Sequence, residues 1–335
     1  SYANKKAHMV GELLGHVFKK AFQTQLRETQ RHYKKRAGNE ARNIKNMICP
    51  DISHNIRTNI IDKNMNQAIT KGEFALGLTH VIKGVSMELA NQTRVDTLSM
   101  QMRVKATVID KNIKTIANRL YHNTQAFTFC PVETPEGQNT GHHKHLSLTT
   151  EMTVPDIQSA EYVRNFIEEQ YKNKSIGIKW LADCVPLDFH GKTKLFLNGN
   201  WLGVVLDYLK LVKMIRELRF RKLIHYHTSV YYDQSDNEVH ISTMGGRFVR
   251  PLLVVRNGFV SASHYKIRKI ASIAKNWDEV IDMFGGDLEY LDVNELMHAM
   301  IALKLSELFW NEYCKKNNKD FKMYSHCEIH PFMMF

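Results

Sequence analysis

The first clear pattern along the chain is an amphipathic one near its start. Apolar side chains there recur every three to four positions, which is the spacing of one helix face. The recurring residues are Val10, Leu13, Leu14, Val17, Phe18, Ala21 and Phe22. We therefore expect a long helix over this stretch. Residues 34–66 are polar and carry Pro50, which is typical of a loop-rich connection.

A second helical region is predicted for residues 64–102. Gly72, Gly77 and Gly84 interrupt it, and glycine in a helix interior costs about 1 kcal/mol relative to alanine. One continuous helix is therefore not expected here.

From about residue 148 the pattern changes to short strands and helices. The dipeptide Asn198-Gly199 separates apolar runs at 195–197 and 201–205, which is a strong signal for a two-residue hairpin. A helix is predicted over 209–218. A second hairpin is predicted around Asp236-Asn237, from strands at 229–232 and 239–243, with a third strand at 248–255. The pattern predicts an α+β, multi-domain fold: a helical region followed by mixed α/β domains with antiparallel hairpins.

Two further groups of side chains need an interpretation. Cations crowd the end of the 209–218 helix, where they complement the helix dipole; they are Arg216, Arg219, Arg221 and Lys222. Within 256–320 the pattern is weaker, and residues 281–308 are predicted to be helical in part. The apolar side chains of that part and its continuation are expected in the core; they are Leu296, Met300, Leu303, Leu308, Trp310 and Tyr313.

Composition adds a strong positive charge. The 335 residues carry a formal net charge of +12. Residues 1–46 alone hold eleven basic and three acidic side chains, an excess of eight. Clustered cations favour a polyanionic partner, although a basic helix face can also be merely solvated.

The cysteines and the hydropathy bear on the compartment. Five cysteines are dispersed along the chain: Cys49, Cys130, Cys184, Cys314 and Cys327. This odd, scattered set argues against a secreted disulfide framework, so a reducing, intracellular compartment is expected. No apolar run of about 18 residues predicts a membrane span, and the start lacks the pattern of a signal peptide.

The most specific stretch, here called the signature loop, comprises Cys130, Pro131, Val132, Glu133, Thr134, Pro135, Glu136, Gly137 and Gln138. Its prolines fix φ and remove backbone donors, while glycine permits a conformation closed to other residues. A rigid, irregular loop that presents Glu133 and Glu136 is therefore expected. Acid/base catalysis or metal binding by these carboxylates is disfavoured, because they lie three positions apart across Pro135.

The signature loop resembles the CP-x-ETPEGQ string of the second-largest, β-like subunit of multisubunit DNA-dependent RNA polymerases. Other strings of that family follow in the same order: KRLDLAGPLL at 5–14, GVSQVLNR at 84–86, STLSHLRR at 97–103, RQLHNTH at 119–124, GLVKNLSL at 141–148, NGVWxGV at 198–204, DAGRVxRPL at 246–252, EYID at 289–292 and HCEIHPS at 326–331. Met100-Gln101-Met102 replaces HLR and His142-His143 replaces an aliphatic pair, which indicates a divergent polymerase and fits a large DNA virus as its source.

The resemblance implies a division into domains. The end of the protrusion is expected at 1–65, the fork at 66–148, external domain 1 at 149–235, external domain 2 at 236–325 and the start of the hybrid-binding domain at 326–335. Family members are several times longer, and an apolar ending such as Phe332 to Phe335 is unusual for a free terminus. An internal fragment or one piece of a split subunit is therefore expected, inactive alone.

The resemblance also implies contacts with nucleic acid. The fork loop, 103–119, faces downstream DNA in the family, where lysines would engage phosphates without reading sequence; solvated lysines are the alternative. Arg119 is expected to hold an RNA phosphate or a loop carboxylate through its planar fork. Glu133 is expected to brace the loop through backbone N–H groups. The implied nucleic-acid-binding residues are Arg103, Lys105, Lys111, Lys114, Arg119, His122, Glu136 and Asn139.

No catalytic or metal-binding residue is expected in this chain. Two candidate zinc sets lack the paired C-x-x-C spacing; they are His142, His143 and His145 with Cys130, and His326, Cys327 and His330. In the family, Mg²⁺ acts in the assembled polymerase. The implied partners are the largest subunit, other polymerase subunits, template DNA and nascent RNA, in a nucleus, or in host cytoplasm or a virion if viral. The alternatives are a non-catalytic nucleic-acid-binding protein derived from a polymerase fragment, and a zinc-dependent hydrolase.

Overall fold

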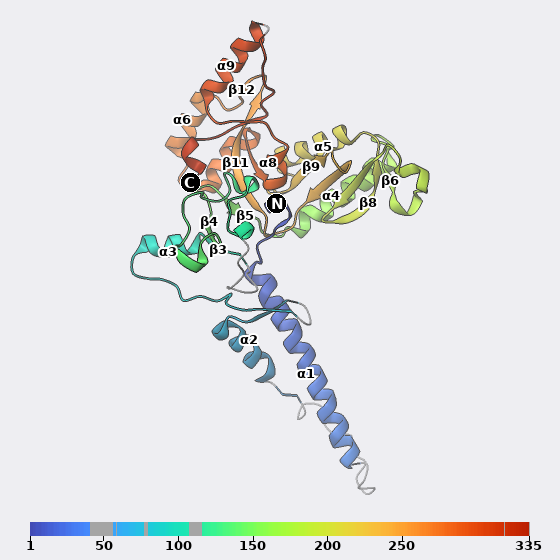
Figure 1. The fold of residues 1–335 in the computed structure, drawn as a ribbon. Coiled ribbons are helices and arrows are strands. Elements are labelled where there is room, and N and C mark those ends of the chain that lie inside the picture. Colours follow the sequence, from blue (N-terminus) through green and yellow to red (C-terminus); the bar gives the residue numbers. More distant parts are fainter. Residues whose placement is uncertain (41–55, 58, 77–79, 107–115, 318, 335) are drawn as a thin grey trace. The chain divides into compact units, whose positions relative to one another are not determined.

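The computed structural model describes residues 1–40, 56–57, 59–76, 80–106, 116–317 and 319–334 (Figure 1). Its internal contacts divide the chain into two units. One unit is His8–Gln101, and the other joins Ser1–Ala7 to Met102–Phe335. Helices dominate the first unit and mixed sheets the second, so the predicted α+β class is confirmed.

The unit His8–Gln101 is built on one long helix. Its elements are α1 (Val10–Glu40), α2 (Asn59–Lys71), β1 (Phe74–Leu76), β2 (His80–Ile82) and α3 (Arg94–Gln101). Leu13 and Val17 of α1 are buried against Ala68 of α2 and Phe74 of β1. The helix predicted from the apolar spacing is therefore confirmed, and α1 and α2 pack along each other (Figure 1).

The helical region predicted over 64–102 was partly wrong. Helix α2 ends at Lys71 because Gly72 takes a φ of 65°, a left-handed conformation that glycine adopts without strain. The antiparallel pair β1 and β2 follows, and helix returns only at Arg94. Residues 41–55 and Gly77 lie outside the described part of the chain.

The second unit contains a five-stranded sheet in the order β6-β8-β7-β10-β9. Its strands are β6 (Lys179–Trp180), β7 (Thr193–Leu197), β8 (Asn200–Val205), β9 (Ser229–Asp233) and β10 (Glu238–Ser242). Helices α4 (Ile157–Lys172) and α5 (Tyr208–Phe220) bury Ile167 and Ile215 in the same core as Leu195 of the sheet. Along β7, buried and partly exposed residues alternate, because successive side chains of a strand point to opposite faces of the sheet.

Both predicted hairpins are present in this sheet. Strands β7 and β8 pair across Asn198-Gly199, whose φ values are 51° and 79°, as a two-residue hairpin turn with two left-handed positions requires. Strands β9 and β10 pair antiparallel, with Asn237 at φ 52°. The helix predicted over 209–218 is α5. The sheet therefore spans residues on both sides of position 235.

A second sheet is centred on the long strand β11, the predicted third strand. Its members are β5 (Glu151–Met152), β11 (Phe248–Arg256), β12 (Phe259–Val260), β13 (Leu288–Asp292), β14 (Ile301–Ala302) and β15 (His326–Cys327). Strand β11 pairs with β13 over Val249 to Leu253 and with β15 at Leu253 and Val254. The pairing with β15 brings the sequence string at 246–252 close to the string at 326–331. Arg250 and Glu328 of these strings are 78 residues apart in sequence and in contact.

Helices α6 (His264–Ile273), α7 (Trp277–Phe284), α8 (Val293–Met297) and α9 (Leu305–Lys316) accompany this sheet. The partly helical prediction for 281–308 missed strands β13 and β14. The core assignment was also wrong for part of the apolar set: Leu308 is buried, but Trp310 is 63% and Tyr313 49% exposed, and they stack on each other with ring centroids 5.4 Å apart. Met300 and Leu303 are also exposed.

The short antiparallel pair β3 (Arg103–Lys105) and β4 (His143–His145) precedes both of these sheets in sequence. His145 pairs with Arg103 and His143 with Lys105. Every residue of β4 is buried, and the strand bonds the signature loop that precedes it in sequence. In the described part of the chain, no helix combines the length and the apolar character needed to cross a membrane.

Candidate nucleic-acid interface

Strand β4 holds the signature loop at two points. The backbone N–H of Cys130 donates to the carbonyl of His145 at 2.9 Å. The hydroxyl of Thr134 donates to the carbonyl of His143 at 3.1 Å and accepts from the N–H of Gly141 at 2.9 Å. The middle of the loop is therefore fixed to a buried strand through its own side chain.

A second threonine closes the far end of the loop. The Oγ1 atom of Thr140 lies 3.0 Å from the carbonyl oxygen of Pro135 and 2.8 Å from that of Gly137. Gly137 has a φ of 79° and begins a single 3-10 turn, Gly137–Asn139. These contacts agree with the predicted rigid, irregular loop.

Arg119 contacts the loop from outside. Its Nη1 atom donates to the carbonyl of Gln138 at 2.7 Å and to that of Thr140 at 3.1 Å. Its own backbone lies against Gly141, where a Cβ would come within 2.3 Å of the Arg119 carbonyl oxygen. The loop partners are thus carbonyl oxygens, not the carboxylate that was offered as one alternative. Contact with an RNA phosphate stays a prediction.

His122 caps the short 3-10 helix Asn123–Gln125. Its Nδ1 atom accepts from the N–H of Thr124 at 3.2 Å and lies 2.8 Å from the hydroxyl of that residue. The same hydroxyl accepts from the N–H of Tyr2 at 2.9 Å, which ties the chain's first residues to this region. A structural role for His122 is therefore established here, and contact with nucleic acid stays a prediction.

Glu133 and Arg103 meet at one histidine. The Nδ1 atom of His145 lies 3.2 Å from Oε1 of Glu133. The Nε atom of Arg103 donates to Nε2 of the same ring at 3.2 Å. His145 is only 3% exposed, whereas the Glu133 side chain is 54% exposed, so the buried ring reaches a carboxylate at the surface. The sequence offered no signal for this bridge beyond the strand alternation at His143 and His145.

The remaining predicted residues are exposed or undescribed. Lys105 is an exposed residue of β3, and Glu136 and Asn139 are exposed at the start and end of the 3-10 turn. The carboxylate of Glu136 does not cap that turn. Lys111 and Lys114 lie outside the described residues.

The two histidine sets proposed for zinc can be compared with the side-chain positions. Among the residues that the structure describes, no three His, Cys, Asp or Glu side chains are grouped so that they could hold a metal ion. The ring of His145 on β4 instead contacts the side chains of Arg103 and Glu133. Burial lowers the pKa of His143, and the nearby cations Lys105 and Arg103 lower it further.

Arg247, which directly precedes β11, and Arg250 within the strand make buried ion pairs. Arg247 Nη1 lies 2.9 Å from Oδ2 of Asp292, and Arg250 pairs with Glu328. The guanidinium of Arg250 also lies over the ring of Phe127, 4.8 Å from its centroid. All four charged residues belong to the sequence strings that resemble the family. The ion pairs therefore connect the string at 246–252 with those at 289–292 and 326–331.

Arg219 forms a third buried centre. It donates to Glu295 at 3.1 Å and to Glu289 at 3.3 Å, and Glu289 also lies 3.2 Å from Nε2 of His326. Although burial opposes ionisation, Arg219 and His326 lower the pKa of Glu289 to about 2. The interpretation of Arg219 as a cation that complements the dipole at the end of its helix therefore does not describe it. Its side chain is only 4% exposed and is paired with buried carboxylates.

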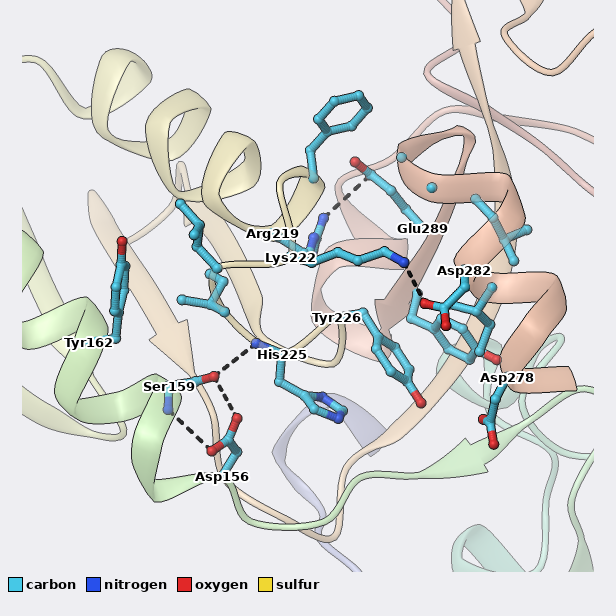
Figure 2. A pocket seen from close by; sticks show the side chains of 18 of the residues that line it. Asp156, Ser159, Tyr162, Arg219, Lys222, His225, Tyr226, Asp278, Asp282 and Glu289 are labelled. Atoms are coloured by element: carbon cyan, nitrogen blue, oxygen red, sulfur yellow. Dashed lines mark hydrogen bonds and ion pairs between the residues drawn. The ribbon is translucent and has the colours of Figure 1, made fainter.

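A cavity of about 510 Å³ lies beside this centre (Figure 2). Its walls come from α4, from the end of α5 and the turn after it, and from α7 and β13. Lys222 reaches across it to Asp282 at 2.5 Å, and Ser159 bonds both Asp156 and the N–H of His225. Most of its polar groups thus have partners within the chain.

Three models of one protein family match the chain. They are RNA polymerase Rpb2 domain 3 over residues 88–152, domain 4 over 195–256 and domain 5 over 277–331. The chain belongs to the family of second-largest RNA polymerase subunits. The signature loop lies inside the domain 3 match, and the Arg247–Asp292 and Arg250–Glu328 ion pairs join the segments matched to Rpb2 domains 4 and 5.

Several curated Rpb2 relatives are similar over nearly the whole chain. DNA-directed RNA polymerase subunit 2 of Acanthamoeba polyphaga mimivirus is 27% identical over 100% of this chain and 28% of that protein. RPB2 of Encephalitozoon cuniculi is 31% identical over 99% of this chain and 28% of that protein. Rpo2 of Saccharolobus shibatae is 28% identical over 92% of this chain and 26% of that protein. The chain thus spans little more than a quarter of these relatives' length.

Proposed function

We propose that this chain acts within a DNA-directed RNA polymerase, where it forms one wall of the cleft and the fork beside downstream DNA and the RNA–DNA hybrid. One observation carries the proposal: the signature loop, in the segment matched to Rpb2 domain 3, is fixed by side-chain bonds from Thr134, Thr140 and Arg119. A preorganised loop binds a partner without the entropic cost of ordering it.

The proposed contacts are electrostatic. Lys105, Lys111 and Lys114 would meet phosphates along downstream DNA, and Arg103 and Arg119 would lie near the loop that faces the hybrid. Phosphate contacts position a duplex without reading its sequence, as a polymerase that copies any template requires. Glu136 and Asn139, which are exposed at the loop's end, would approach nascent RNA. His122 would support this region.

The proposed role in the reaction is to hold and orient. Nucleotidyl transfer would use two Mg²⁺ ions of the assembled polymerase, which stabilise the attacking and leaving oxygens. The proposed partners are the largest subunit and other subunits of the complex, with template DNA and nascent RNA. The domain limits proposed above, from protrusion to hybrid-binding domain, assign the signature loop to the fork and the two larger sheets chiefly to the external domains.

The proposal is tested by binding of a fluorescent RNA–DNA hybrid and of unrelated duplex DNA, followed by anisotropy from 50 to 200 mM salt. We expect weak binding with little sequence preference, because phosphate contacts dominate. The logarithm of the affinity should fall linearly with the logarithm of salt, with a slope close to the number of phosphates neutralised. The chain alone should incorporate no nucleotides.

A matched pair of charge reversals locates the interface. Lys105→Glu should weaken binding and reduce the salt slope by about one. Lys213→Glu, at an exposed position of α5 far along the chain, carries the same charge change and should leave both unchanged. Binding that ignores salt, or equal effects of the two substitutions, would contradict the proposed interface.

A further inference from the structure

His145 occupies an unusual position between a cation and an anion. Arg103 of β3 lies on its Nε2 side and Glu133 of the signature loop on its Nδ1 side, each at 3.2 Å. The ring is on β4, which is buried throughout. The family string GLVKNLSL has asparagine at this position, so the string itself does not account for the bridge.

The chemistry of the two neighbours determines the state of the ring. An arginine Nε–H can only donate, so Nε2 of His145 must accept and must carry no proton. The proton of the neutral ring is then on Nδ1, where it can be donated to the carboxylate of Glu133. One tautomer satisfies both contacts, and the bonds form a continuous series from β3 through β4 to the loop.

We propose that His145 is a positioning residue whose neutral ring joins the signature loop to strand β3. A second proton on the ring removes the acceptor used by Arg103 and places two cations side by side, while attraction to Glu133 increases. The connection between β3 and the loop is therefore broken on one side as the pH falls. This inference concerns the chain's own geometry and does not depend on what the loop binds.

The surroundings of the ring favour its neutral form near pH 7. Burial lowers the pKa of His145, Glu133 opposes this, and Arg103 lowers it again. His143 and Lys144 are neighbours on the same strand, Lys105 lies on β3 opposite His143, and Cys130 of the loop is bonded to the His145 carbonyl. Burial and the Arg103 cation thus oppose a second proton on the ring, whereas Glu133 favours it.

The decisive measurement is long-range ¹⁵N–¹H NMR of the histidine rings, recorded on the unmodified chain from pH 8 to pH 5. We expect His145 to keep its proton on Nδ1 and to titrate below pH 6.5. Over the same pH range, exchange of the amide hydrogens of Ala106 and Leu146, which bond to the carbonyls of His142 and Met102 beside the β3–β4 pair, should accelerate roughly tenfold beyond the intrinsic pH effect, as expected when the Arg103 hydrogen bond is lost. The amide of Asn198, bonded to Ile241 in the five-stranded sheet, serves as the internal control.

Two substitutions separate positioning from general destabilisation. Glu133→Gln should lower the midpoint of the His145 titration, whereas Arg103→Met should raise it and abolish the acceleration of amide exchange. Substitution of the exposed His190 by Asn should change neither. A proton on Nε2 at pH 8, or a midpoint unaffected by both substitutions, would overturn the proposal. The tautomer is read in the unmodified chain, so the test does not depend on the variants folding.

Discussion

Arg250 and Glu328 form an ion pair in which each side chain is only 1% exposed. Removal of one partner leaves an uncompensated buried charge, so Glu328→Leu should lower the free energy of unfolding by about 3–5 kcal/mol. The double replacement Arg250→Met with Glu328→Leu removes both charges and should cost less than Glu328→Leu alone. Chemical denaturation of the four species in a double-mutant cycle measures the coupling.

The exposed pair Arg164 and Glu168 is the control for this cycle. Their side chains are 63% and 44% exposed and lie one helical turn apart on α4, where such a pair contributes about 0–1 kcal/mol. If Glu328→Leu destabilises the chain no more than Glu168→Leu does, the Arg250 pair does not join the two matched segments as described.

Gly137 of the signature loop and Gly141 just after it share a backbone conformation but not their surroundings. Gly137 and Gly141 both have left-handed backbones, with φ values of 79° and 75°. A Cβ at Gly137 meets nothing within 4 Å, whereas one at Gly141 comes within 2.3 Å of the Arg119 carbonyl oxygen. Gly137→Ala should cost about 1–2 kcal/mol from backbone strain, and Gly141→Ala clearly more, because overpacking adds about 1–3 kcal/mol. Thermal unfolding of both variants would show the difference, and equal losses would contradict the close approach to Arg119.

Local patterns predicted the elements that are determined locally. The hairpins at Asn198 and Asn237 followed from turn residues that tolerate positive φ, and α1 followed from one apolar face. The same apolar spacing placed Trp310 and Tyr313 on one face of a helix but could not show whether anything covers that face. Periodicity reports orientation, whereas burial depends on distant segments.

The site was predictable only in its location. The signature loop could be recognised from nine consecutive residues, but Arg219 bonds Glu289 and Glu295 at separations of 70 and 76 residues. No short-range pattern encodes such a contact, so a cation at the end of a helix was indistinguishable from a solvated one. The Arg103–His145 contact spans 42 residues and was missed for the same reason.

Arg119 should matter more than the fork-loop lysines. Arg119→Ala removes two bonds from one guanidinium nitrogen to the carbonyls of Gln138 and Thr140, and should weaken the loop by about 1–2 kcal/mol in amide exchange. Arg119→Lys keeps the charge but loses the planar fork, so its effect should be smaller. In an assembled polymerase, elongation rates should fall in the same order.

Lys111→Ala is the comparison, since a single solvated phosphate contact contributes little. The opposite result would contradict the greater importance of Arg119. In that result, a polymerase with Arg119→Ala elongates at the unmodified rate, whereas one with Lys111→Ala elongates slowly.

Acid should destabilise the region around β4. Burial lowers the pKa of His143, assisted by Lys105 and Arg103, and burial also lowers that of His145, from an ordinary value of 6.5. A group whose pKa is depressed in the folded state binds its proton more readily when the chain unfolds. Its stabilising effect is therefore complete above about pH 6.5 and is lost as the pH falls through the folded-state value.

His143→Val separates this effect from ordinary packing. The Nδ1 atom of His143 is buried and has no hydrogen-bond partner among the residues that the structure describes. The family string has an aliphatic residue in this pair, so valine should be tolerated at pH 8. Between pH 6.5 and 5 the variant should lose less stability than the unmodified chain, by up to about 1.4 kcal/mol per pH unit for one proton. Urea denaturation at each pH gives the two slopes, and His190→Val at an exposed position is the control. If the free energy of unfolding falls with pH at the same rate in the unmodified chain and in His143→Val, His143 does not take up a proton on unfolding. A histidine that does so would, when replaced, remove its proton from the pH dependence of stability.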